Sequence, residues 1–164
     1  MIIYPEGVED TIRMADWACQ RLEEPIEAFG FNRYGQPMFQ CLGFGRNDTL
    51  LCVVVVYHVT QDNVFMAFAA DSPRWVSKEN IAALGDWVFN QMGKSRITAT
   101  VKKGNKRARK FDEGMGFKVE GKLRKAVDGN DMIIYGLLKD EHKAWLRKAF
   151  HGKGKHTDRG GGSV

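Results

Sequence analysis

A run of apolar residues in the first half of the chain constrains the fold more than any other feature. Residues 50–59 are almost entirely apolar, and residues 53–56 are four consecutive valines. A strand with one face in water alternates apolar and polar residues, whereas a strand covered on both faces does not. The sequence therefore predicts a central strand, over residues 50–59, in an α/β sheet that is covered on both sides.

Further strands are predicted around this central one. Short apolar segments bounded by glycine, asparagine, aspartate or proline indicate strands joined by turns. They cover residues 37–44, 64–70, 97–101, 117–126 and 132–138. Turn-forming residues at 45–48 and 128–131 make hairpins of two of the connections.

Four helices are predicted where apolar residues recur every three or four positions. They cover residues 7–22, 77–92, 105–113 and 140–150. Ser77 is a candidate N-cap of the second helix, and glycines follow the second and third. This order of elements predicts one domain over residues 1–150, followed by a glycine-rich basic tail over residues 151–164.

The composition excludes several classes of protein. The apolar runs are far shorter than the roughly 20 residues that span a bilayer, so no membrane partner is expected. The N-terminus lacks the basic and apolar regions of a secretory signal, and we therefore expect a cytoplasmic protein. Cys19, Cys41 and Cys52 have no CxxC or metal-ligand spacing, which predicts reduced thiols and no metal site.

Positive charge is concentrated in two places, and the net charge is +5. A group of basic residues close together in the sequence is most often a solvated helix face. The alternative is that the group binds phosphate, RNA or an acidic protein. The first group is Lys102, Lys103, Lys106, Arg107, Arg109 and Lys110, and the second is Lys143, Arg147, Lys148, Lys153 and Lys155.

A series of residues in the last third of the chain resembles a known pattern. It consists of Asn105, Ala108, Gly116-Phe117, Glu120-Gly121, Leu123-Arg124, Asp131, Tyr135-Gly136-Leu137-Leu138 and Glu141. The segment resembles the GNAT superfamily of N-acetyltransferases, in the branch with ribosomal-protein and phage-encoded enzymes. The resemblance implies the GNAT fold, a mixed central sheet with splayed strands flanked by helices. Strands 64–70 and 97–101 should then be adjacent, parallel and divergent at their C-terminal ends.

The resemblance also implies acetyl-CoA as co-substrate and a primary amine on a protein, small molecule or aminoacyl group as acceptor. It places Phe68, Ala69 and Ala70 on the exposed strand edge that binds the pantetheine arm. It places Asn105 and Arg107 beside the cofactor. Asn105 is alternatively a plain helix N-cap, and the two roles can coexist.

Residues 71–80 depart from the family pattern, because the loop that cradles the pyrophosphate in the family carries glycines and this segment has none. A cradle here must take its charge from Arg74 and Lys78 and its N–H donors from the next helix. The tyrosine that protonates the leaving thiolate in many members is Asp112 here, which leaves that role vacant.

Asp71 and His58 are the candidates for handling the proton of the amine. The alternative for Asp71 is a cap on the turn that it begins, and for His58 a structural role inside an apolar strand. Two functions therefore remain open. The chain is an acetyl-CoA-dependent N-acetyltransferase, or a GNAT-fold protein without turnover that serves as a binding or structural component. A component of a phage particle is one example of the second function, and a phage-encoded protein would lie in the host cytoplasm or in the virion.

Overall fold

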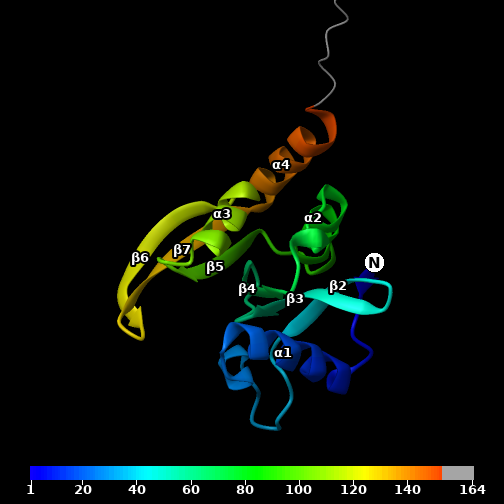
Figure 1. Ribbon diagram of the computed structural model, residues 1–164, viewed down its shortest axis with the longest axis vertical. Coiled ribbons are helices and arrows are strands. Elements are labelled where there is room, and N and C mark those ends of the chain that lie inside the picture. Colours follow the sequence, from blue (N-terminus) through cyan, green and yellow to red (C-terminus); the bar gives the residue numbers. More distant parts are fainter. Residues whose placement is uncertain (153–164) are drawn as a thin grey trace, which may run out of the picture.

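The computed structural model describes residues 1–152, which fold around one seven-stranded sheet (Figure 1). Residues 153–164 of the predicted tail, with Lys153 and Lys155 of the second basic group, lie outside the described residues. The strand order is β1-β2-β3-β4-β5-β7-β6. Between residues 1 and 152, no helix combines the length and the apolar character that crossing a bilayer requires.

The elements follow the predicted order. The strands are β1 (Ile2–Ile3), β2 (Gln40–Arg46), β3 (Thr49–Tyr57), β4 (Asn63–Ala70), β5 (Arg96–Lys102), β6 (Lys118–Val127) and β7 (Asn130–Leu138). The helices are α1 (Val8–Leu22), α2 (Lys78–Gly85), α3 (Lys106–Gly114) and α4 (Lys139–His151), with 3-10 turns at Ile26–Phe29 and Pro73–Trp75.

Two elements differ from the predicted ones. β1 was not expected, because two residues are too short for a periodic signal, and its Ile2 is opposite Phe44 of β2. The predicted helix 77–92 is α-helical only to Gly85 and continues as a π-helical segment, Asp86–Gln91. Its N-cap is Ser77 as predicted, since the hydroxyl accepts a hydrogen bond from the backbone N–H of Asn80 at 3.0 Å.

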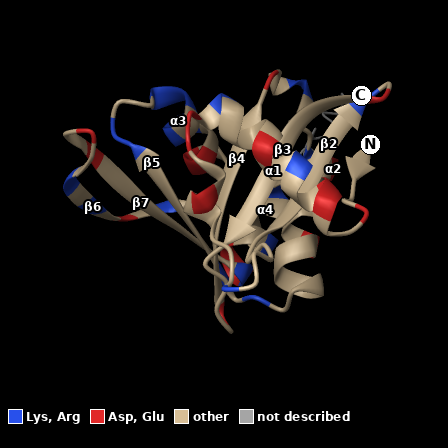
Figure 2. Cartoon of the chain, turned by 90° about the horizontal axis from the view of Figure 1, so that it is seen from below, with Lys and Arg blue, Asp and Glu red and all other residues tan. Residues whose placement is uncertain are grey.

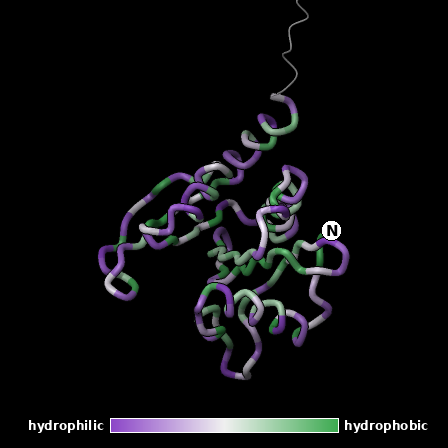
Figure 3. Tube along the Cα trace, in the orientation of Figure 1, coloured by the Kyte–Doolittle hydropathy of each residue, from purple (hydrophilic) through white to green (hydrophobic). Residues whose placement is uncertain are grey.

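The central strand β3 is covered on both faces, as its unbroken apolar run predicts. Val53 and Val55 pack in a cluster with α1, whereas Val54 and Val56 pack in a second cluster with α2 and the π-helical segment. All four side chains are fully buried. Figure 3 shows the same arrangement, with hydrophobic colour concentrated over β2, β3 and β4.

The sheet divides between β4 and β5, its one parallel pair of neighbours. Only three residue pairs join them, and the last is Phe65 with Thr98. Beyond this pair β4 stays bonded to β3 as far as Ala70, and β5 stays bonded to β7 as far as Lys102. The two halves of the sheet diverge like a fork (Figure 2). The prediction of adjacent, parallel and diverging strands is confirmed.

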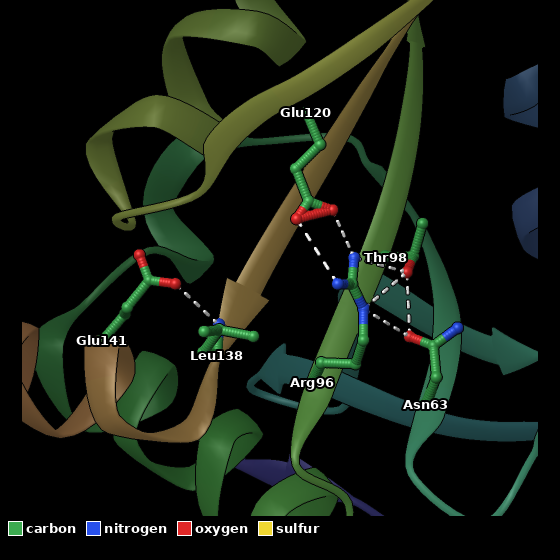
Figure 4. Close-up of polar contacts among 6 residues, drawn as sticks. All are labelled: Asn63, Arg96, Thr98, Glu120, Leu138 and Glu141. Carbon is green, nitrogen blue, oxygen red and sulfur yellow. Dashed lines mark hydrogen bonds and ion pairs between the residues drawn. The ribbon is translucent and has the colours of Figure 1, made fainter.

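Polar side chains hold the closed end of this fork together (Figure 4). Asn63 Oδ1 on β4 accepts hydrogen bonds from Thr98 Oγ1 at 2.8 Å and from Arg96 Nε at 3.3 Å on β5. Arg96 also forms an ion pair with Glu120 of β6, with Nη2 and Oε1 2.5 Å apart. Glu120 reaches across β7 because the β7 residue beneath its side chain is Gly136. A Cβ atom on Gly136 would lie 2.3 Å from the Glu120 carboxylate. We call these four residues, Asn63, Arg96, Thr98 and Glu120, the fork clamp.

Helix α4 packs against α2 through a contact that requires glycine. The imidazole of His142, 4% exposed, lies against Gly85, so that an added Cβ would be 1.8 Å from Nε2. The ring also stacks on Trp145 and packs against Phe89. It therefore has little room to move away.

Replacing Gly85 with alanine should destabilise the fold, because the new methyl group overlaps the confined His142 ring. We expect a loss of about 1–3 kcal/mol in the free energy of unfolding, measured by urea denaturation. The matched control is Gly114→Ala in α3, where nothing lies within 4 Å of the new Cβ and stability should hold or rise slightly. Equal stabilities of the two variants would contradict the contact.

Candidate functional site

The fork contains a cavity of about 740 Å³. Most of its walls come from the end of α1, β4, the 3-10 turn after β4, β5 and α3, with further residues from the 3-10 turn after α1, the end of β3 and the β6–β7 hairpin. The lining residues used below are Tyr57, His58, Met66, Phe68, Ala69, Ala70, Trp75, Lys102, Asn105, Arg107, Ala108, Phe111 and Asp112.

The cavity passes through the sheet from one face to the other. Along β4, Ala67 and Ala69 belong to the cluster on the α1 face, whereas Met66 and Phe68 belong to the cluster on the opposite face. All four line the cavity. Because no strand fills the gap between β4 and β5, two ligands can enter from opposite faces and meet between the strands.

Aromatic side chains form the wall between β4 and α3. Phe68 and Phe111 have ring centroids 4.7 Å apart, and Trp75 lies 5.4 Å from Phe111. Trp75 also packs 5.2 Å from Phe44 and is 3% exposed. Trp75 is therefore a packing residue, and the side of the cavity facing the start of α2 is apolar.

Asn105 begins α3 and lines the open end of the cavity. Its Oδ1 accepts a hydrogen bond from the backbone N–H of Ala108 at 3.1 Å, which confirms the predicted N-cap. The cap uses only the carbonyl oxygen, and the side-chain NH2 keeps two donors for a ligand. Contact with a cofactor remains a prediction, and the two roles are compatible.

The cationic side chains of the first basic group have different roles. Arg107 and Lys102 line the open end of the cavity, and Figure 2 shows basic residues gathered around α3. Arg109 is structural, because its guanidinium donates to the Tyr135 hydroxyl and to the Lys103 carbonyl, each at 3.1 Å.

The role of Arg74 and Lys78 at the phosphates stays a prediction. Neither Arg74 nor Lys78 is among the residues that line the cavity. Lys78 instead places its Nζ 4.8 Å from the centre of the Phe150 ring on α4. The positive charge in the cavity lining comes from α3, the end of β5 and Arg21 of α1.

Asp71 forms an ion pair that fixes the end of β4 to α1. Its carboxylate accepts two hydrogen bonds from Arg21, at 2.6 and 2.9 Å, and the guanidinium stacks 3.4 Å over Trp17. The Arg21 hydrogen bonds lower the pKa of Asp71, which keeps the carboxylate ionised and weakens it as a base. Asp71 is absent from the cavity lining, so the geometry supports a bracing role.

His58 lies outside the strand in which the sequence placed it. β3 ends at Tyr57, and His58 is exposed with a φ of 46°. The prediction of a structural histidine inside an apolar strand is therefore wrong, because the chain turns one residue earlier. His58 lines the α1 face of the cavity, and its role in handling a proton stays a prediction.

Asp112 is a residue of this site whose chemistry the sequence did not reveal. It is 1% exposed, lines the cavity, and its Oδ1 has no hydrogen-bond partner within residues 1–152. Burial, with a smaller contribution from the charge of Glu113, raises the pKa of Asp112 to about 7. The sequence signal that could have found it is that Asp112 follows Asn105 by seven positions, which places both residues on one face of α3.

The lining offers contacts to a ligand that carries amide groups and an anionic end. The unpaired edges of β4 and β5 offer backbone N–H and C=O groups to amides, as a strand edge does for a peptide. Ala69 and Ala70 leave room at that edge, whose β4 side also carries Phe68. Phosphates would find Lys102 and Arg107 at the open end.

Solved structures with similar architecture are acetyltransferases. Mutant forms of the spermidine/spermine N-acetyltransferase SpeG from Vibrio cholerae superpose with a TM-score of 0.65 and 13% identity, over 88% of this chain and 97% of that one. Mycobacterium smegmatis RimJ, solved with CoA-disulfide, superposes with a TM-score of 0.61 and 19% identity, over 90% of this chain and 87% of that one. The ribosomal-protein-S5-alanine acetyltransferase from Vibrio fischeri superposes with a TM-score of 0.61 and 15% identity, over 85% of this chain and 92% of that one.

The chain has the GNAT fold. The superpositions and the fork between β4 and β5 confirm the fold that the Asn105 to Glu141 segment predicted. Identities of 13–19% show the fold alone. No protein-family model and no curated protein matches this sequence.

The buried carboxyl of Asp112 should make stability depend on pH. Its pKa rises from 3.8 in the unfolded chain to about 7 in the fold, so its contribution is fully present below pH 4. That contribution is lost as the pH rises through 7, by up to about 4 kcal/mol. Asp112→Asn should remove this dependence, and urea denaturation of both proteins at pH 4, 6 and 8 measures the difference. Parallel pH profiles of the two proteins would contradict the assignment.

Proposed function

We propose that this chain is an N-acetyltransferase that transfers an acetyl group from acetyl-CoA to a primary amine. The observation that carries the proposal is the cavity that crosses the sheet at the fork, between two unpaired strand edges. The acetyl donor supplies a thioester, which is activated toward attack by an amine. The acceptor belongs to a protein, a small molecule or an aminoacyl group.

The two faces of the cavity suit two different substrates. The α3 face carries Asn105 and Arg107 with Lys102 nearby, a set of donors and positive charges for a phosphorylated donor. The α1 face carries Tyr57 and His58, with Glu24 at its rim as a negative charge for an ammonium group. An amine that enters from the α1 face reaches the thioester carbonyl through the gap between the strands.

The chain's own groups can assist the reaction in the gap. Beyond Phe65, backbone N–H groups of β4 on the fork side are not used by β5, and they can stabilise the oxyanion that forms at the carbonyl. His58, exposed at the α1 face, is placed to take a proton from the incoming amine. The walls of alanine and aromatic side chains exclude water from the thioester.

A second function is favoured by one specific observation. The wall nearest the start of α2 is apolar, and the segment 71–80 that would cradle a pyrophosphate contains no glycine. A GNAT-fold protein that has lost the donor would keep the fork and serve as a binding or structural component. Isothermal titration with acetyl-CoA at low salt separates the two functions without knowledge of the acceptor. Binding supports the transferase, and its absence supports the scaffold.

Variants of Asn105 should separate its cap from its contact with the donor. Asn105→Ser retains a capping oxygen and loses the amide donors, whereas Asn105→Ala loses both. We expect both to weaken acetyl-CoA binding by about 1–3 kcal/mol in titration calorimetry. Only Asn105→Ala should also lower the thermal stability. Unchanged affinity in both folded variants would reduce Asn105 to a cap.

The source of positive charge for the phosphates can be tested with two double variants. Replacing Lys102 and Arg107 with alanine should lower acetyl-CoA affinity about tenfold or more, and the loss should shrink at high salt. The matched control replaces Arg74 and Lys78, which carry the same charge but do not line the cavity. It should change affinity by less than about twofold, because these charges lie away from the cavity and are screened. A larger loss of affinity in the Arg74 and Lys78 variant than in the Lys102 and Arg107 variant would place the phosphates at the start of α2.

A further inference from the structure

One carboxyl group in the cavity has no interaction that explains its burial. Asp112 shares the cavity-facing side of α3 with Ala108 and Phe111, and its Oδ1 is unpartnered in the described part of the chain. A buried polar group without a partner costs free energy, and such groups often serve chemistry.

The strand register places Asp112 near the closed end of the fork. The backbone N–H of Phe117 donates to the Asp112 carbonyl at 3.0 Å, and the next residue, Lys118, is opposite Gly136. Gly136 is in turn opposite Thr98, which belongs to the last pair that joins β4 and β5. The C-terminal part of α3 is thus level with the point where the strands separate.

The charges define which end of a donor reaches Asp112. Lys102 and Arg107 lie at the open end of the cavity, beside the start of α3. A phosphorylated donor therefore has its phosphates at the open end and its thioester deeper in the fork. This orientation brings the sulfur toward the C-terminal half of α3, where Asp112 lies.

We propose that Asp112 is the acid that protonates the sulfur when the thioester is cleaved. This inference rests on the proposed transferase function. The amine nitrogen forms a bond to the carbonyl carbon, the C–S bond breaks, and the sulfur leaves with the bonding electron pair. The proton of the Asp112 carboxyl passes to the sulfur and gives the free thiol. The proton that the amine nitrogen loses enters the solvent, and the Asp112 carboxylate takes a proton back from the solvent.

The surroundings of Asp112 keep the proton available at neutral pH. Burial, aided by repulsion from Glu113, raises the pKa of Asp112 to about 7. A thiol has a pKa of about 8.5, so transfer from this carboxyl to a thiolate is downhill. Glu113 accepts a hydrogen bond from the Tyr135 hydroxyl at 2.9 Å. The other charged or titratable groups of the cavity are Lys102 and Arg107 at the open end and Arg21, Glu24, Tyr57 and His58 on the α1 face.

The protonation state can be measured without turnover. In protein labelled with ¹³C at the aspartate carboxyl carbons, the signal that disappears in Asp112→Asn should titrate with a midpoint near pH 7. Addition of acetyl-CoA should raise this midpoint, because the ligand excludes water from the carboxyl. A midpoint below pH 5 in the free protein would overturn the inference.

The chemical role can be measured with two thioesters and an amine that the wild-type protein acetylates. With acetyl-CoA, Asp112→Asn should lower kcat about 100- to 10,000-fold. With an S-acetyl derivative of an aromatic thiol of low pKa, the loss should be under about tenfold, because this thiolate leaves without a proton. The wild-type kcat with acetyl-CoA should fall as the pH rises above the midpoint measured with acetyl-CoA bound, and the variant should lack this fall.

Glu113→Gln is the matched control on the same helix. It removes the neighbouring negative charge and leaves the Asp112 carboxyl in place, so it should keep kcat and move the fall to lower pH. Equal losses with both thioesters in Asp112→Asn, or an unchanged kcat, would overturn the role of Asp112 alone. Failure of the wild-type protein to bind acetyl-CoA would overturn the proposed function, and this inference with it.

Discussion

The fork clamp is the interaction on which the rest of the site depends. Asn63, Arg96, Thr98 and Glu120 join β4, β5 and β6 at one end of the sheet, across Gly136 of β7. The Arg96–Glu120 pair is partly exposed, so its own contribution to stability is small, about 0–1 kcal/mol. Its importance is geometric, because it fixes the level at which the two strands part. Everything beyond that level is unpaired backbone, and the cavity forms there.

The parting of the strands also decides which side chains share the cavity. β4 presents alternate residues to opposite faces of the sheet, and only a gap in the sheet brings both sets to one space. The gap places α1 and the exposed His58 on one face and α3 on the other. It gives an amine and a phosphorylated thioester separate entrances, and this separation is the physical basis of the proposed transfer. Asp71 is tied to α1 by its ion pair with Arg21.

The candidate site was predictable where a residue's role depends on its own helix or strand. Asn105 as an N-cap follows from its position within one element, and the resemblance supplied the edge residues Phe68, Ala69 and Ala70. The surroundings of the cations at the start of α2 did not follow, because they depend on the direction of side chains between elements. Lys78 lies against Phe150, which is 72 positions later in the chain. Asp112 is a similar case, since its burial depends on how α3 packs against the rest of the fold, where Phe111 contacts Phe68 and Trp75.

The sequence by itself determined the order of the elements and the double burial of β3 and, through the resemblance carried by residues 105–141, the parallel pair that opens the fork. The order and the burial follow from apolar periodicity and from turn and cap residues, which act over a few positions of the chain. Only the tertiary structure decided that Arg96 reaches Glu120 over Gly136, that Asp71 is tied to Arg21, and that Asp112 is buried without a partner. Each of these depends on which distant side chain fills the neighbouring space. A carboxyl pKa responds to that space, through the loss of water and the charges nearby, and not to the position of the residue in the sequence.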